Sequence, residues 1–197
     1  HQSACSHNLH ANSVGRNREL QEKLLIETTE DARELQLDQL EQEARNNLER
    51  TAPFFFKGQW HNLPVFKVEI GFPRYRMENG RTRRKQIEFR HKNPDRAADL
   101  DDPSSKIAQE IQGQILGEMA NEEGLLDLLR QGQSDPILLS HQGYAVNGNR
   151  RLAAMRYLHD NPSKKNEAVD FSFVEVARLP ELDEKEIRRI EQRLQMS

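Results

Sequence analysis

The segment 136-PILLSHQGYAVNGNRRLAAMRYL-158 decides the fold that this sequence predicts. It begins with a short apolar run at 136–139 and a second apolar run at 144–146, separated by a glycine-containing turn. This pattern is typical of two adjacent antiparallel strands. From residue 152 to 158 the apolar residues recur at helical spacing instead. The order strand, turn, strand and helix predicts a domain of mixed α/β class.

The connection between the second strand and the helix, Asn147 to Arg151, carries the chemistry of this segment. The start of a helix presents unpaired backbone N–H groups and a partial positive charge. Gly148 would let the backbone approach an anion closely, and Arg150 and Arg151 add guanidinium groups that match phosphate oxygens. The pattern predicts a site for a di- or triphosphate or a nucleic-acid phosphate. The alternative is that both arginines cap the local fold and form salt bridges within it.

The same two periodicities predict the elements on either side of this segment. Strands are expected at Leu63–Ile70 and Phe171–Ala177, and helices at Ile107–Ala120, Leu125–Leu129 and Asp183–Met196.

Residues 16–50 contain neither proline nor glycine and are rich in Glu, Gln, Leu and Arg, which predicts one or two amphipathic helices. This segment either packs on the domain through its leucines or serves as a dimerisation or partner helix. Pro53 is expected to end it, with Phe54–Phe56 anchoring it to the core. The predicted organisation is therefore a disordered or extraneous terminus (1–15), a helical appendage (16–52) and an α/β domain (53–197).

The run from Arg74 to Lys92 has eight basic and two acidic residues, so it carries six net positive charges in nineteen residues. Such a run indicates an anionic partner, or neutralisation by the acidic stretch Asp95–Asp102. Trp60 is expected in the core or at a hinge rather than in a base-stacking platform. The candidate contacts to a DNA backbone are Arg81, Arg83, Arg84 and Lys85.

Composition excludes several classes of protein. The net charge of −3 excludes a globally basic nucleic-acid binder but allows a local basic patch. A single cysteine, Cys5, excludes a disulfide framework within the chain and a cysteine-based zinc site. No apolar run reaches the roughly 18 residues that a transmembrane helix needs, so we expect no membrane partner. The absence of an export signal predicts a cytoplasmic protein.

The segment Gly143–Ala154, GYAVNGNRRLAA, resembles the ParB/sulfiredoxin superfamily. ParB-like domains have a strand, the motif G-Y-x-x-(D)-G-x-R-R-x-x-A and a helix at this point. Phe72–Arg76 is similar to the first box of the family, and Val174–Asp183 to its last strand and loop. Glu191–Gln195 stands where the family has a Glu-Asn box. The likeness covers about residues 63–197.

This resemblance implies a small mixed sheet with flanking helices that binds nucleotide phosphates, as ParB proteins bind CTP and sulfiredoxins bind ATP. Relatives of this type act as NTPases or nucleases on DNA in plasmid, phage or defence contexts. By position, Gly148, Arg150 and Arg151 would hold the phosphates, and Arg74 and Arg76 would approach them from the first box.

The resemblance also implies catalytic roles. Glu191 would help to hold Mg²⁺ and would act in catalysis with Asn149 and Arg150. Asparagine stands where sulfiredoxins have the nucleophilic cysteine, so the chain is not expected to be a sulfiredoxin. Asn149 can orient a water or a phosphate but cannot accept a proton. The expected function is a Mg²⁺-dependent NTPase or DNase, or alternatively a non-enzymatic DNA-binding or protein-interaction module with an idle nucleotide site.

Overall fold

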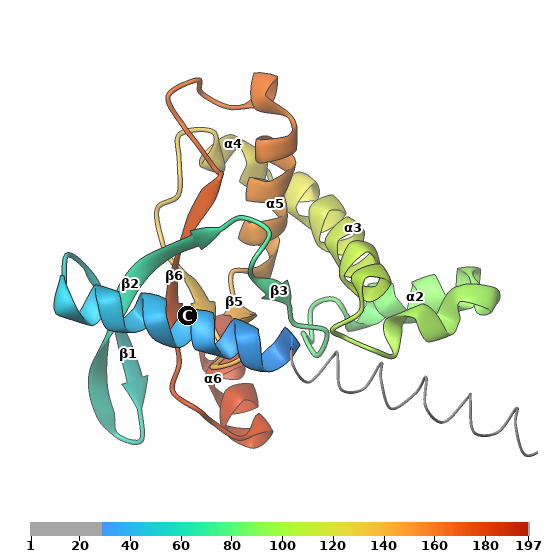
Figure 1. Cartoon of the computed structure of the whole chain (residues 1–197). Coiled ribbons are helices and arrows are strands. Elements are labelled where there is room, and N and C mark those ends of the chain that lie inside the picture. Colours follow the sequence, from blue (N-terminus) through green and yellow to red (C-terminus); the bar gives the residue numbers. More distant parts are fainter. Residues whose placement is uncertain (1–28, 197) are drawn as a thin grey trace, which may run out of the picture.

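The structure is a computed structural model that describes residues 29–196, and these residues form a mixed α/β fold (Figure 1). The predicted terminus at 1–15 and the start of the predicted appendage lie outside the described residues. The described chain begins with a helix over residues 29–46. The strands are β1 (Thr51–Phe56), β2 (Gln59–Glu69), β3 (Arg74–Tyr75), β4 (Ile137–Leu139), β5 (Tyr144–Asn147) and β6 (Phe173–Arg178). The later helices are α2 (Arg83–Lys92), η1 (Pro94–Leu100), α3 (Lys106–Glu122), α4 (Leu125–Leu129), α5 (Asn149–Asp160), η2 (Pro162–Lys164) and α6 (Glu184–Met196).

In the described part of the chain, six strands form one sheet in the order β1-β2-β6-β4-β5-β3. The β1–β2, β2–β6 and β4–β5 pairs are antiparallel, whereas β4–β6 and β3–β5 are parallel. The fold class predicted from the sequence is thus confirmed as mixed α/β.

The sheet is covered on both faces, and the alternation of side chains along each strand explains how. In β6, Val176 belongs to the larger apolar cluster with α3, α4 and α5. The next residue, Ala177, belongs to a second cluster with Ile187 and Ile190 of α6. Helix α6 therefore packs on the opposite face, which places it next to the end of β5, where the predicted anion site lies.

The helix at 29–46 lies across the molecule and is an integral part of its core (Figure 1). Leu37 is fully buried in the larger apolar cluster. Asp38 accepts a 2.6 Å hydrogen bond from the buried guanidinium of Arg178 in β6. Of the two predicted roles for this segment, the structure shows packing on the domain. The boundary expected at residue 52 is wrong, because β1 already begins at Thr51 and belongs to the sheet.

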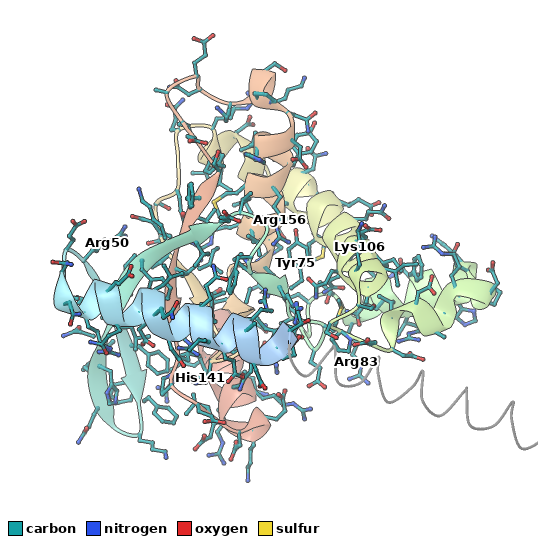
Figure 2. The ribbon with its side chains drawn as sticks, viewed as in Figure 1. Arg50, Tyr75, Arg83, Lys106, His141 and Arg156 are labelled. Atoms are coloured by element: carbon teal, nitrogen blue, oxygen red, sulfur yellow. The ribbon has the colours of Figure 1, made fainter. Side chains whose placement is uncertain are left out.

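Arg156 of α5 fixes the short edge strand β3. Its guanidinium lies 4.6 Å from the centre of the Tyr75 ring (Figure 2). It also donates hydrogen bonds to the backbone carbonyl oxygens of Ile70, at 3.0 Å, and Pro73. These contacts hold the segment that leads into Arg76 beside β5.

The expectation that Pro53 ends a helix is wrong, because Pro53 lies within β1. Phe54–Phe56 belong to the same strand, where Phe54 is buried in the second apolar cluster and Phe56 packs against that cluster. Lys57 and Gly58 have φ values of 49° and 74°, which close a two-residue hairpin turn and pair β1 with β2. Proline is tolerated in β1 because β1 is an edge strand. Trp60 is 71 % exposed and therefore does not lie in the core.

No helix among residues 29–196 has the length and apolar character needed to cross a membrane.

The packing of the helix at 29–46 gives a first prediction. Leu37→Ala should lower the free energy of unfolding by about 2–5 kcal/mol, because it leaves a cavity in the core. Leu35→Ala, on the same helix but 58 % exposed, should change it by less than about 0.5 kcal/mol. Urea unfolding followed by circular dichroism measures both variants. If both substitutions changed the free energy of unfolding by the same small amount, the helix at 29–46 would not be an integral part of the core.

Candidate functional site

The predicted anion site is built on a sharp turn between β5 and α5. Gly148 has a φ of +93° and is the N-cap residue of α5, with no side chain capping the helix. A Cβ at this position would lie 2.6 Å from Cδ1 of Ile137. Position 148 therefore requires glycine for both its backbone conformation and its close packing. The first turn of α5 presents its backbone N–H groups in front of this turn.

A cavity of about 230 Å³ opens at this turn. It is bounded by residues from the β5–α5 connection, from the turn after β3, from the α3–α4 connection and from α6. Its charged lining residues are Arg81, Glu123, Arg150, Arg151 and Glu191. The sequence-predicted residues Asn147, Gly148 and Asn149 also line it. The structure thus brings most of the predicted phosphate-binding residues together around one cavity.

Arg150 and Arg151 are held in different ways. Arg150 forms an ion pair with Glu123, at the C-terminus of α3. Arg151 donates a 2.9 Å hydrogen bond to the backbone carbonyl oxygen of Asp135, and within residues 29–196 no carboxylate lies within ion-pairing distance of it. Burial lowers the pKa of Arg151 from its ordinary value. The alternative in which both arginines only stabilise the local fold therefore describes Arg150 better than Arg151.

Arg81 lines the cavity, although its place in the basic run predicts a contact to a DNA backbone. It lies in the turn after β3, where its backbone N–H donates a 3.0 Å hydrogen bond to Oδ1 of Asn79. No carboxylate of the described chain pairs with its exposed side chain. The Asn79-Gly80 pair signalled the turn itself, but nothing local indicated that the turn would lie beside α5.

Asn149 is buried, with 3 % of its surface exposed, and both polar atoms of its side chain are engaged. Its Nδ2 donates a 2.7 Å hydrogen bond to the carbonyl oxygen of Ala145. Its Oδ1 accepts a 3.1 Å hydrogen bond from the backbone N–H of Arg76. The geometry gives this residue, predicted to be catalytic, the role of joining α5 to two neighbouring strands.

Arg76 and Glu191 form a buried ion pair rather than two free functional groups. Nε of Arg76 lies 2.6 Å from Oε1 of Glu191, and the same guanidinium pairs with Glu184. Burial raises the pKa of Glu191, and the charge of Arg76 partly counters this shift. A hydrogen bond from Arg76 lowers the pKa of Glu184. Arg74 is also engaged, because it pairs with Glu30 of the helix at 29–46.

Neither Arg74 nor Arg76 lines the cavity, so the structure does not bring these two predicted residues together with the others.

The predicted magnesium ligand lacks companions. Glu191 is the one predicted metal ligand, and one of its oxygens already accepts a hydrogen bond from Arg76. Among the described residues, no group of three or more His, Cys, Asp or Glu side chains is arranged to hold a metal ion. Magnesium prefers several oxygen ligands in an octahedral arrangement. These residues therefore do not fit a magnesium site supplied by the protein alone.

A second cavity of about 880 Å³ adjoins the first between α2 and α6. The two cavities share Asn79, Glu191 and Gln195. Arg83, at the start of α2, borders the second cavity, and no carboxylate of the described chain pairs with it (Figure 2). The two cavities are therefore neighbours beside the β5–α5 turn.

The remaining predicted DNA contacts are partly neutralised. Arg84 is 90 % exposed in its side chain but lies 3.2 Å from Glu88, and Lys85 lies 3.8 Å from Glu122. Arg90 pairs with Asp101, which is the neutralisation by the neighbouring acidic stretch that the sequence suggested. Within the described chain, Arg81 and Arg83 have no such partner.

Comparison of the chain with models of protein families, with curated proteins and with solved structures gave no match. The resemblance to the ParB/sulfiredoxin superfamily therefore rests on the motif and on the order of the boxes in the sequence.

The turn gives a second prediction. Gly148→Ala should lower the free energy of unfolding by more than about 1 kcal/mol, because the new methyl group meets Ile137 and the positive φ becomes strained. Gly117→Ala is the matched control, because Gly117 lies in α3 and, apart from its chain neighbours and the backbone of its own helix, nothing lies within 4 Å of the place that a methyl group would take there. Chemical unfolding should show that this control gains roughly 0.5–1 kcal/mol. A neutral effect of Gly148→Ala would contradict the described turn.

Proposed function

We propose that this protein binds the phosphates of a nucleotide at the turn between β5 and α5. The observation that carries the proposal is the cavity in front of Gly148, where an uncapped helix N-terminus meets three guanidinium groups. Backbone N–H groups at a helix start and arginine side chains are both well suited to hold phosphate oxygens.

The charge of the cavity favours an anion. Arg81, Arg150 and Arg151 contribute three positive charges, against the carboxylates of Glu123 and Glu191. Burial shifts the pKa of Glu191 upwards, which makes its negative charge less favourable in this environment. A phosphate that replaces Glu123 would form a new ion pair with Arg150 and would also contact Arg81 and Arg151.

The size of the cavity limits what it holds. Sites for whole small ligands have volumes of roughly 300–1,000 Å³, so a cavity of about 230 Å³ suits phosphate groups rather than an entire nucleotide. The adjoining cavity of about 880 Å³ has room for the nucleoside. In this arrangement the phosphates lie at α5 and the sugar and base lie between α2 and α6.

The resemblance to ParB-like domains supports the same segment as a site for CTP or ATP. The proposal is limited to binding, because Asn149 is engaged by the backbone and the described residues do not themselves supply a magnesium site. Any Mg²⁺ would enter with the triphosphate that it accompanies in solution.

Isothermal titration tests the proposal with CTP, ATP and inorganic triphosphate, each with and without Mg²⁺. Arg81→Gln should weaken binding about tenfold or more, since a hydrogen bond to a charged group contributes roughly 1.5–3 kcal/mol. Arg81 is exposed, so this variant should fold normally. Arg84→Gln is the matched control, because Arg84 is 90 % exposed and lies outside the cavity.

The proposal would be overturned if none of the three anions gave a heat of binding. It would also be overturned if Arg81→Gln and Arg84→Gln weakened binding equally. Phosphate release by the wild-type protein, abolished by Arg150→Ala, would extend it from binding to hydrolysis.

A second candidate function is binding of a DNA backbone, and the observation that favours it is the lack of described ion-pair partners for Arg81 and Arg83. Anisotropy of a labelled 20-base-pair duplex at increasing salt measures this activity. Replacing both Arg81 and Arg83 by glutamine should make the slope of the logarithm of the binding constant against the logarithm of the salt concentration less steep by about 1.8, or about 0.9 for each lost phosphate contact. An unchanged slope would remove these residues from any DNA contact.

A further inference from the structure

The β1–β2 hairpin extends past the body of the molecule (Figure 1) and carries a cross-strand pair of aromatic residues. Phe55 and Trp60 are cross-strand partners, and their ring centres lie 5.3 Å apart in an edge-to-face arrangement. The Trp60 side chain is 71 % exposed. The Trp60 ring is therefore accessible to a flat ligand. Trp60 belongs to neither of the apolar clusters that cover the two faces of the sheet.

Helix α6 places cations beside this aromatic pair. The guanidinium of Arg193 lies 5.0 Å from the centre of the Phe55 ring. Lys185 and Arg189 precede Arg193 at intervals of four residues, so the three side chains follow one exposed side of the helix. None of the three has an ion-pair partner in the part of the chain that the structure describes. Lys57 at the hairpin tip adds a further cation, although it lies 3.5 Å from Glu186.

This surface is separate from the phosphate cavity. The cavity is lined by Glu191, Leu194 and Gln195, whereas Arg193 faces the hairpin on the other side of α6. A ligand could therefore occupy either place without contacting the other.

The free edge of β1 is poorly suited to receive an added strand. Pro53 lacks a backbone N–H, and the carbonyl oxygen of Phe55 already accepts a 3.3 Å hydrogen bond from Arg193. Both features block pairing with an extended peptide. The accessible groups of this surface are therefore the Trp60 ring and the cations of α6.

We infer that the β1–β2 hairpin and the exposed side of α6 form a binding site for single-stranded nucleic acid. The exposed Trp60 ring can stack with an unpaired base, and a row of cations without ion-pair partners can follow the phosphate backbone. A duplex does not offer its base faces, so the site favours a single strand. Single-stranded DNA and RNA both offer unpaired bases on a polyanionic backbone, so the site suits either.

Trp60 is the only tryptophan of the sequence, so its fluorescence reports directly on this site. Titration with 15-nucleotide oligo(dT) and oligo(U) at low salt should quench its emission, and the tighter of the two identifies the preferred nucleic acid. A 15-base-pair duplex should quench it less.

Variants are measured by anisotropy of a labelled oligo(dT). Trp60→Ala should weaken binding about fivefold or more, the smallest effect expected for one stacked base. Arg189→Gln should make the slope of the logarithm of the binding constant against the logarithm of the salt concentration less steep by about 0.7. This is the value for one phosphate contact to a single strand. Tyr157→Ala and Lys106→Gln are the matched controls, because both side chains are exposed on other helices. Circular dichroism and thermal unfolding confirm that each variant is folded.

The inference would be overturned if neither Trp60→Ala nor Arg189→Gln changed oligonucleotide binding. It would also be overturned if neither oligo(dT) nor oligo(U) quenched the fluorescence of Trp60. Equal binding of the duplex would also contradict it, because stacking would then play no part. Saturating ATP should leave oligonucleotide binding unchanged. The outcome is thus independent of whether the phosphate cavity binds a nucleotide.

Discussion

The side chain of Asn149 is the contact on which the candidate site depends. It accepts a hydrogen bond from the backbone of Arg76, just after β3, and donates one to Ala145 in β5. The first turn of α5 is thereby fixed to two strands that are far apart in the sequence. Because both polar atoms of the carboxamide are engaged, an anion bound as proposed would contact the backbone N–H groups of α5 and the nearby guanidinium groups.

Among residues 29–196, two groups of arginines differ in how they are engaged. Arg76, Arg156 and Arg178 are engaged with carboxylates, carbonyl oxygens or an aromatic ring and hold separate elements together. Arg81 and Arg189 lie on the surface without a carboxylate partner among residues 29–196. Net charge and local composition do not distinguish the two groups, because the partners of a buried arginine come from distant parts of the chain.

Periodicity identified most of the sheet and helices, since strands and helices that bury one side repeat their apolar residues at different intervals. It missed β1, where three consecutive phenylalanines follow a proline and show no alternation. It also missed β3, whose two residues are too few to show a period. Both strands form through pairing with a partner, β1 through a two-residue turn and β3 through the contacts of Arg156.

The sequence alone determined the β5–α5 turn, because the glycine, the polar residues and the helical spacing that define it are neighbours in the chain. It also located Arg150 and Arg151 beside that turn. Only the tertiary structure decided which distant residues complete the site. It brought Arg81 to the cavity and joined Arg76 to Glu191, across more than a hundred residues. Such pairings depend on how the sheet is ordered and on which face each helix covers, and no local pattern encodes either.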